Sequence, residues 1–218
     1  MKRVLMTGAA GGIGTMLTPL PRRKPWELAS QVATVDRMSK GRVILSIGLG
    51  APDAGFADFG EVTDRATRAE LMDEHLTIIR GLWAGQPFRF HGKHHHIEPT
   101  EFPAIGNAHR PEGVTIWCVG AIGAARSMQR ALSCDGLIPQ TVDEGGARAA
   151  TLEELCAVRD LPTDRPYDVV VEGSNTEHSP AAWAAAGATW WIESMWQAMN
   201  EADPVGAARE LLRAGPPT

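Results

Sequence analysis

The sequence predicts an α/β fold built on parallel strands, and two observations support this prediction. From residue 15 onward, about six β-branched or apolar runs alternate with segments of helical periodicity. One stretch also contains a whole unit: a β-like run that ends near Pro19, a helical segment from Pro25, and a second run over 42–47 that leads into Gly48-Leu49-Gly50. A strand–helix–strand unit that ends in glycines is typical of parallel α/β proteins and often binds a cofactor. Periodicity leaves open whether the strands form a barrel or an open sheet.

The other elements follow the same alternation. Residues 67–83 place apolar side chains at the spacing of a helix with one buried face, and 88–97 suits a small exposed hairpin. We expect further strands over 114–119, 136–138, 167–172 and 189–194, and helices over 124–133, 151–158, 180–186 and 204–213. In the last helix the residues predicted to face inward are Val205, Ala208, Leu211 and Leu212.

Composition narrows the classes of function. The chain has 218 residues, 44% of them hydrophobic and 22% charged, which suits one globular domain. A net charge of −5 argues against a nucleic-acid partner. No apolar run approaches the ~20 residues of a membrane span, and glycines interrupt the only apolar start, so we expect no membrane partner and a cytoplasmic location. Three widely spaced cysteines suggest neither disulfides nor zinc.

Several phrases resemble those of luciferase-like monooxygenases, the flavin- or F420-dependent oxidoreductases. They are TPLPRR followed by a proline, DRMSKGR before a strand, IW before a glycine loop, CDGLIP, YDVVVEG, AGATWWIES and RAGPP. The resemblance covers about residues 14–217 and implies a TIM (β/α)8 barrel of the bacterial-luciferase type. A complete barrel typically needs about 250 residues, so we expect one that is incomplete at its N-terminus. We divide the chain into a strand and glycine turn over 1–14 and a barrel domain over 15–218, a single domain overall. Open strand edges would then favour a homo-oligomer.

The first 14 residues, MKRVLMTGAAGGIG, resemble the nucleotide-binding turn of short-chain dehydrogenases and epimerases. That motif needs a helix directly after it, whose N-terminus holds the pyrophosphate. Here Pro19 and Pro21 leave no room for such a helix. Asp36 has a suitable distance for a ribose-binding acid, but it follows a helical pattern. We therefore expect no NAD(P) binding.

The resemblance implies a cofactor, FMN or coenzyme F420, at the carboxyl ends of the strands. A non-prolyl cis peptide, Met16–Leu17 by position, would form a bulge behind the cofactor ring. The loop after residue 119 would hold the cofactor phosphate, which agrees with its small residues, the helix start that follows and the cation Arg126. The expected cofactor-binding residues are Thr15, Met16, Leu17, Gly48, Gly50, Gly120, Ala121, Gly123, Ala124, Ala125 and Arg126. The sequence identifies no catalytic acid or base.

Four histidines, His91, His94, His95 and His96, lie within six residues. Imidazole is a good ligand for zinc or nickel, but apart from Glu98 no further ligand closes a coordination set. We therefore expect no metal site. His75 is interpreted as a residue on a helix face.

The main functional expectation is a luciferase-like oxidoreductase that performs monooxygenation or transfers hydride to a small organic substrate. Truncation of the barrel would impair it. Two alternatives remain at this point. One is an NAD(P)-dependent protein related to short-chain dehydrogenases and epimerases, and the other is a non-catalytic remnant barrel that acts as an interaction partner.

Overall fold

A computed structural model describes residues 2–3, 13–51, 54–85, 87–102, 113–144, 146–158, 164–173, 178–193 and 201–214. The chain forms two compact units. The N-terminal unit comprises residues 12–117, and the C-terminal unit comprises residues 1–11 and 118–218.

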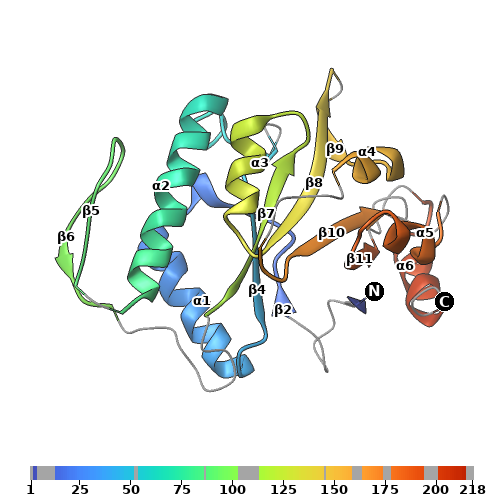
Figure 1. The fold of residues 1–218 in the computed structure, drawn as a ribbon, viewed down its shortest axis with the longest axis horizontal. Helices are drawn as coiled ribbons and strands as arrows, with labels where there is room; N and C mark the ends of the chain where they lie inside the picture. The colour runs from blue at the N-terminus through green and yellow to red at the C-terminus, as the bar shows by residue number, and fades with distance from the viewer. Residues whose placement is uncertain are drawn as a thin grey trace. The chain divides into compact units, whose positions relative to one another are not determined.

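The N-terminal unit contains parallel strands, two long helices and an antiparallel hairpin (Figure 1). Strands β2 and β3 both pair in parallel with β4, and β5 pairs with β6. Its elements are β2 (Ile13–Gly14), β3 (Thr18–Pro19), the 3-10 helix η1 (Leu20–Arg22), α1 (Pro25–Ser39), β4 (Val43–Gly48), α2 (Arg65–Trp83), β5 (Phe88–His91) and β6 (His96–Thr100). Strand β7 (Thr115–Ala121) crosses the boundary between the units.

Local chemistry sets the ends of the two long helices. Pro25 occupies the first turn of α1, where its missing N–H costs nothing. Lys40 ends that helix in the left-handed conformation, with a φ of 60°. The side chain of Asp64 accepts a hydrogen bond of 2.7 Å from the backbone N–H of Thr67 and so caps α2. The predicted positions of both helices and of β4 are confirmed.

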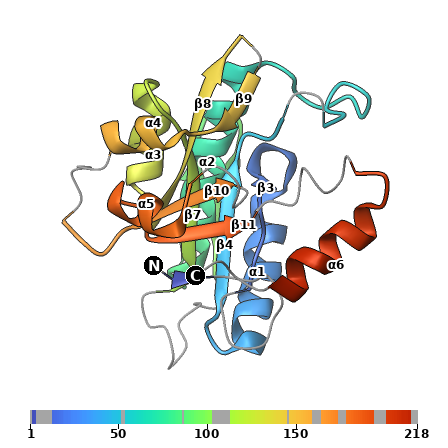
Figure 2. The ribbon, with the colours of Figure 1, turned by 90° about the vertical axis from the view of Figure 1, so that its right-hand side faces the viewer.

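The C-terminal unit has the strand order β1-β11-β10-β8-β7, and the pairs β1–β11, β10–β11 and β10–β8 are parallel. Figure 2 shows β10 and β11 running side by side. Besides β7, the elements are β1 (Lys2–Arg3), α3 (Ala125–Leu132), β8 (Gly136–Asp143), β9 (Gly146–Ala149), α4 (Leu152–Ala157), β10 (Asp168–Gly173), α5 (Pro180–Ala185), β11 (Trp190–Glu193) and α6 (Pro204–Ala214).

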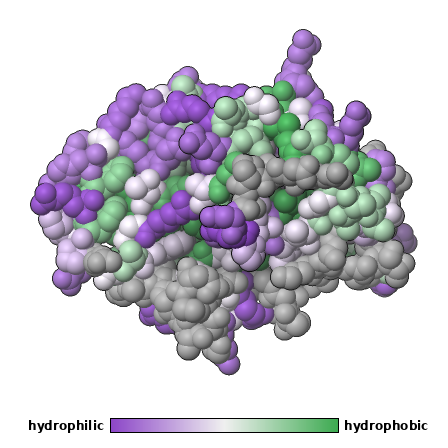
Figure 3. Space-filling view, viewed as in Figure 1, coloured by the Kyte–Doolittle hydropathy of each residue, from purple (hydrophilic) through white to green (hydrophobic). Residues whose placement is uncertain are grey.

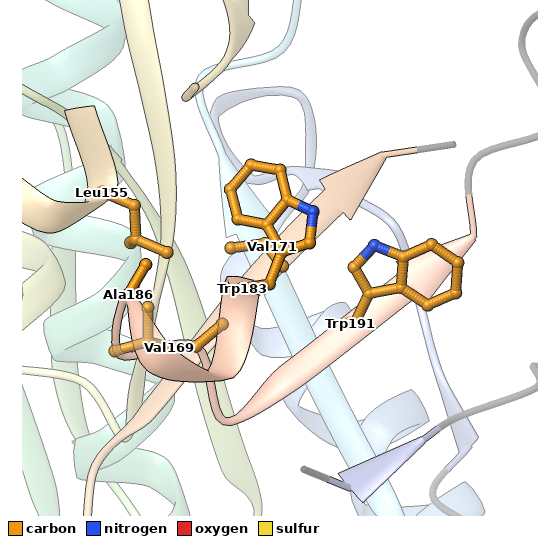
Figure 4. Close-up of a cluster of buried hydrophobic side chains, with 7 residues drawn as sticks. Leu155, Val169, Val171, Trp183, Ala186 and Trp191 are labelled. Atoms are coloured by element: carbon orange, nitrogen blue, oxygen red, sulfur yellow. The ribbon is translucent and has the colours of Figure 1, made fainter. Parts of the chain in front are cut away.

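An apolar cluster holds α4 and α5 against the strands of this unit (Figure 4). Trp183 of α5 and Leu155 of α4 lie over Val169 and Val171 of β10, with Trp191 of β11 beside them. All five side chains are buried. Alternate residues of a strand point to one face, so the YDVVVE run supplies every second side chain to this cluster.

Two predictions about the C-terminal unit are wrong in part. The strand expected over 136–138 continues to Asp143 and turns back as β9, which pairs with it in an antiparallel ladder. The projecting end of this hairpin is hydrophilic (Figure 3). The sequence therefore has no apolar pattern there from which the hairpin could be predicted. In α6, Val205, Leu211 and Leu212 are exposed rather than inward-facing, and no residue of the helix is buried.

The N-terminal glycine motif lies largely outside the described residues. Ile13 and Gly14 form β2, in register with Val43 and Ile44 of β4. After Gly14 the chain continues into β3, and the first α-helix begins only at Pro25. The helix that a dinucleotide turn requires directly after Gly14 is therefore absent from the described part of the chain. No described helix is long and apolar enough to cross a membrane.

Candidate functional site

The expected residues of the N-terminal unit lie along the second half of β4 and at its carboxyl end. Pro19 pairs with Gly48, so both strands end at the same level. The Thr15 hydroxyl lies 2.9 Å from that of Thr18 and donates to the Ser46 carbonyl at 3.3 Å. The Met16–Leu17 peptide bond is cis, as expected. The structure thus places Thr15, Met16 and Leu17 between β2 and β3, beside the part of β4 that leads to Gly48.

Gly50 has a positive φ of 80°, which favours glycine. A Cβ at this position would lie 2.9 Å from the Pro19 Cβ and 3.0 Å from the Phe56 ring. The missing side chain is therefore required by contacts within the protein. The loop after β4 folds back tightly, and Gly50 allows this turn.

Two arginines fix this loop, and the sequence reasoning missed both. Arg68 of α2 is 3% exposed and donates from its Nη1 to the Gly50 carbonyl at 3.1 Å and the Leu49 carbonyl at 3.4 Å. Its guanidinium lies 4.7 Å from the centroid of the Phe56 ring, and that of Arg22 lies 4.6 Å from the same centroid. Among the described residues, the Arg68 Nε has no hydrogen-bond partner.

Arg22 adds further links to the loop. Its Nη1 donates to the Ala54 carbonyl at 2.9 Å, and its Nε forms an ion pair with Glu61. Cation–π contacts of this kind are stronger when they are shielded from water. A signal was present in the sequence: Arg68 falls on the same helical face as Met72 and His75, both of which are buried.

Asp36 does not take the position of a ribose-binding acid. It is 1% exposed, and its Oδ1 accepts a hydrogen bond of 3.3 Å from the backbone N–H of Val43. Val43 begins β4, whereas cofactors in parallel α/β proteins bind at the carboxyl ends of strands. Asp36 instead fixes the connection between α1 and β4.

In the C-terminal unit, Gly120 owes its lack of a side chain to packing. A Cβ there would lie 2.4 Å from the Leu137 Cδ1, 3.0 Å from the Met128 Sδ and 3.2 Å from the Ala131 Cβ. Gly120 therefore allows α3 to lie close against the strands. Gly123 differs: its φ is 83° and no atom lies within 4 Å of a Cβ built there, so it serves an open turn.

Backbone hydrogen bonds shape the loop between these glycines and α3. The Ala121 N–H donates to the Ser127 Oγ at 3.0 Å, and the Ile122 N–H donates to the Gln140 carbonyl at 2.8 Å. The Ala124 N–H closes the turn on the Ala121 carbonyl at 3.0 Å. These contacts hold the loop in one shape at the end of β7.

The first turn of α3 begins beside this loop. Its N-cap is Ala124, which supplies no side-chain hydrogen bond to the helix. The N–H groups of a first helical turn lack partners within the helix and attract anions. Ala125 and Arg126 occupy this turn, and both are exposed. An anion would therefore meet backbone donors and one guanidinium here.

The histidine region is not a metal site of recognisable form. Among the described residues, no group of three or more His, Cys, Asp or Glu is placed to hold a metal ion. His75 lies on the buried face of α2: it is 2% exposed, and its Nδ1 lies 2.9 Å from the Leu20 carbonyl. Burial lowers the pKa of His75, against the opposing effect of that hydrogen bond.

A family model described as "luciferase-like monooxygenase" matches residues 12–214. Solved structures agree in fold. An F420-dependent secondary alcohol dehydrogenase in complex with an F420–acetone adduct is 20% identical, with a TM-score of 0.57, and the match covers 74% of this chain and 48% of that one. Monooxygenase RslO1 from Streptomyces bottropensis is 18% identical, with a TM-score of 0.57 and coverages of 92% and 57%.

A third similar structure is the FMN-bound oxygenating constituent of 3,6-diketocamphane monooxygenase from the CAM plasmid of Pseudomonas putida. It is 19% identical, with a TM-score of 0.53 and coverages of 74% and 47%. The chain therefore spans about half the length of these proteins. They are luciferase-like TIM-barrel proteins, so the predicted α/β fold of this type is confirmed.

Proposed function

Because the chain belongs to the luciferase-like monooxygenase family, we propose that it binds FMN or coenzyme F420 and acts as an oxidoreductase on a small organic substrate. The family match over residues 12–214 is the observation that carries this proposal. Further support comes from similar structures that are F420-dependent or hold FMN.

The loop over 120–126 is the proposed phosphate site. Its fit to a phosphate rests on the uncapped first turn of α3 and on exposed Arg126 within that turn. Backbone N–H groups and a guanidinium are the donors that phosphates favour. The residues proposed to contact the phosphate end are Gly120, Ala121, Gly123, Ala124, Ala125 and Arg126.

The strand ends of the N-terminal unit are the proposed ring site. Thr15, Met16, Leu17, Gly48 and Gly50 would contact the isoalloxazine or deazaflavin ring. Arg68 and Arg22 act indirectly, because their contacts hold the loop after β4 in shape. Gly50 meets Pro19 and Phe56, so its proposed contact with the ring is through the backbone.

When bound, such a cofactor supplies hydride transfer or, for reduced FMN, the activation of oxygen. The protein's own part is to bind and orient the ring and to limit its exposure to water. No described residue is assigned as a catalytic acid or base.

Reconstitution tests the proposal. The purified chain is titrated with FMN and, separately, with F420, and binding is followed by quenching of cofactor fluorescence. NADH and NADPH serve as control ligands. We expect saturable binding of FMN or F420 and none of the nicotinamides. If neither flavin-type cofactor binds to a folded sample, the proposal is wrong.

Three further expectations stay predictions. They are a homo-oligomer, a single domain over 15–218, and a cytoplasmic location. Sedimentation velocity tests the first, and a single cooperative unfolding transition would support the second.

A further inference from the structure

The turn of hairpin β5–β6 lies against helix α2 within the N-terminal unit (Figure 1). Phe88 of the hairpin packs so closely on Gly81 of α2 that a Cβ at Gly81 would lie 2.0 Å from the ring. Gly92 is similarly close, since its Cβ would lie 2.4 Å from the Glu74 Oε1. The hairpin is therefore docked on the helix through close contacts.

Two histidines face each other across this interface. The Nε2 of His75, on α2, lies 3.3 Å from the Nε2 of His95, on the hairpin. The other ring nitrogen of each histidine meets an oxygen: the Nδ1 of His75 lies 2.9 Å from the Leu20 carbonyl, and the Nδ1 of His95 lies 3.0 Å from the Glu74 Oε2. The result is a row of three contacts, from carbonyl to carboxylate.

The partners in this row determine how many protons the two histidine rings carry. A carbonyl oxygen only accepts, so the Nδ1 of His75 must carry hydrogen. An ionised carboxylate also only accepts, so the Nδ1 of His95 must carry hydrogen too. The contact between the two Nε2 atoms needs one proton more. Three protons on four ring nitrogens make one of the two rings an imidazolium.

The surroundings of Glu74 and His75 decide where this charge lies. Burial raises the pKa of Glu74, but hydrogen bonds from the His94 N–H, the His95 ring and the Lys93 N–H outweigh it and lower the pKa. Glu74 therefore stays ionised and accepts. Burial lowers the pKa of His75, so this buried ring favours its neutral form.

The remaining neighbours do not supply another donor for the contact between the rings. His94 lies 2.9 Å from Glu70 through its Nε2, and Lys93 lies 2.8 Å from the same carboxylate. From α1, only the ring of Trp26 approaches His95 among the described contacts, edge-on at 6.2 Å between centroids. A structural zinc ion would need four ligands, and no group of three suitable side chains exists among the described residues.

We propose that His75 and His95 share one extra proton, and that this proton fastens the β5–β6 hairpin to helix α2. The proton is held only while the hairpin is docked, so docking binds it. By linkage, the proton stabilises docking fully below the pKa of an ordinary histidine, about 6.5. This stabilisation is lost as the pH rises above that value. Docking also weakens at acid pH. There a fourth proton, on His75, would abolish the hydrogen bond between the rings, and protonation of Glu74 would remove the acceptor for His95. The result is a latch that is strongest in mildly acidic solution.

The imidazole signals of the full-length chain, labelled with 15N, test the proton count. Long-range 1H–15N spectra distinguish protonated from bare ring nitrogens. At pH about 6 we expect three protonated nitrogens on His75 and His95 together, and two at pH about 8. Two neutral rings in the docked state at the lower pH would overturn the proposal. So would stoichiometric zinc in the purified protein whose removal by a chelator releases the hairpin.

Hydrogen exchange of the Lys93 and His94 amides, which donate to Glu74, reports docking. After correction for the intrinsic pH dependence of exchange, we expect protection at least tenfold lower at the higher pH. In His95→Gln the amide can donate to His75 without an added proton, so this dependence should disappear. His96→Gln removes an exposed histidine from the same hairpin and should keep it. An unchanged pH profile in His95→Gln refutes the latch, and if that variant does not fold, the wild-type spectra still decide.

Discussion

Arg68 donates a hydrogen bond of 3.1 Å to the backbone oxygen of Gly50, which links the first turns of α2 to the loop that follows β4. The guanidinium is almost fully buried and lies against the Phe56 ring. A charged donor that satisfies loop carbonyls in a buried place stabilises the loop more than a neutral one would.

Replacing this side chain should therefore unfold the protein more easily. Arg68→Met keeps much of the volume but leaves two carbonyls without their donor, and we expect a loss of about 2 kcal/mol in the free energy of unfolding. Urea denaturation followed by tryptophan fluorescence measures it. Arg65→Met, at an exposed position of the same helix, is the control and should change stability by less than about 0.5 kcal/mol. Equal effects of the two substitutions would contradict the role of Arg68.

Gly120→Ala tests the explanation of the glycine at the end of β7. The added Cβ would overlap the Leu137 side chain, which is fully buried. Overpacking of this kind typically costs about 1–3 kcal/mol. Adding Leu137→Ala should relieve the overlap, so the double variant should lose less stability than the sum of the two single variants. Strict additivity would mean that Leu137 does not limit this position.

The start of α4 should give a distinct acid response. Glu154 accepts two hydrogen bonds of 2.9 Å from Arg148 and one of 2.8 Å from the backbone N–H of Thr151. The Arg148 side chain first, and the Thr151 N–H second, lower the pKa of Glu154 to about 2. A depressed carboxyl pKa stabilises the fold above the ordinary value of 4.5, and this contribution is lost as the pH falls toward 2.

Glu154→Gln should therefore flatten the dependence of the unfolding midpoint on pH between these values. Thermal unfolding at a series of pH values provides the measurement. Glu153→Gln, one residue earlier and exposed, is the matched control, and it should keep the wild-type slope. An unchanged slope in Glu154→Gln would show that solvent screens the pair completely.

Much of the fold could be predicted because its elements obey simple periodic rules. The apolar residues Met72, Leu76, Ile79 and Trp83, spaced by four, three and four positions, predicted α2. Gly48, which follows the run over 42–47, predicted the end of β4. The C-terminal part of β8 and the whole of β9 could not be predicted, because a solvent-exposed hairpin such as the one that contains Asp143 and Arg148 has no buried face to impose a pattern. The exposed apolar face of α6 shows the converse case: a pattern predicts a face, but it does not say what covers that face.

The candidate site was predictable only in its backbone. The positions of Gly50 and Gly123 follow from turns that need a positive φ. Arg68, Phe56 and His75 depend on contacts between residues far apart in the chain, and single-residue patterns do not report those. The role of Gly120 was also hidden, because the atoms that exclude a side chain there belong to Leu137 and Met128.

The central claim is that the loop at the start of α3 binds the phosphate of a flavin-type cofactor, and Arg126 is where it is tested most directly. The measurement is a paired titration of wild type and Arg126→Glu with FMN and with riboflavin, which lacks the phosphate. A charge-assisted contact is worth about 1.5–3 kcal/mol, and 1.4 kcal/mol corresponds to tenfold in affinity. We therefore predict that the substitution weakens FMN binding by tenfold or more and leaves riboflavin binding within about twofold. An equal loss for both ligands, or no loss for either, would contradict the claim.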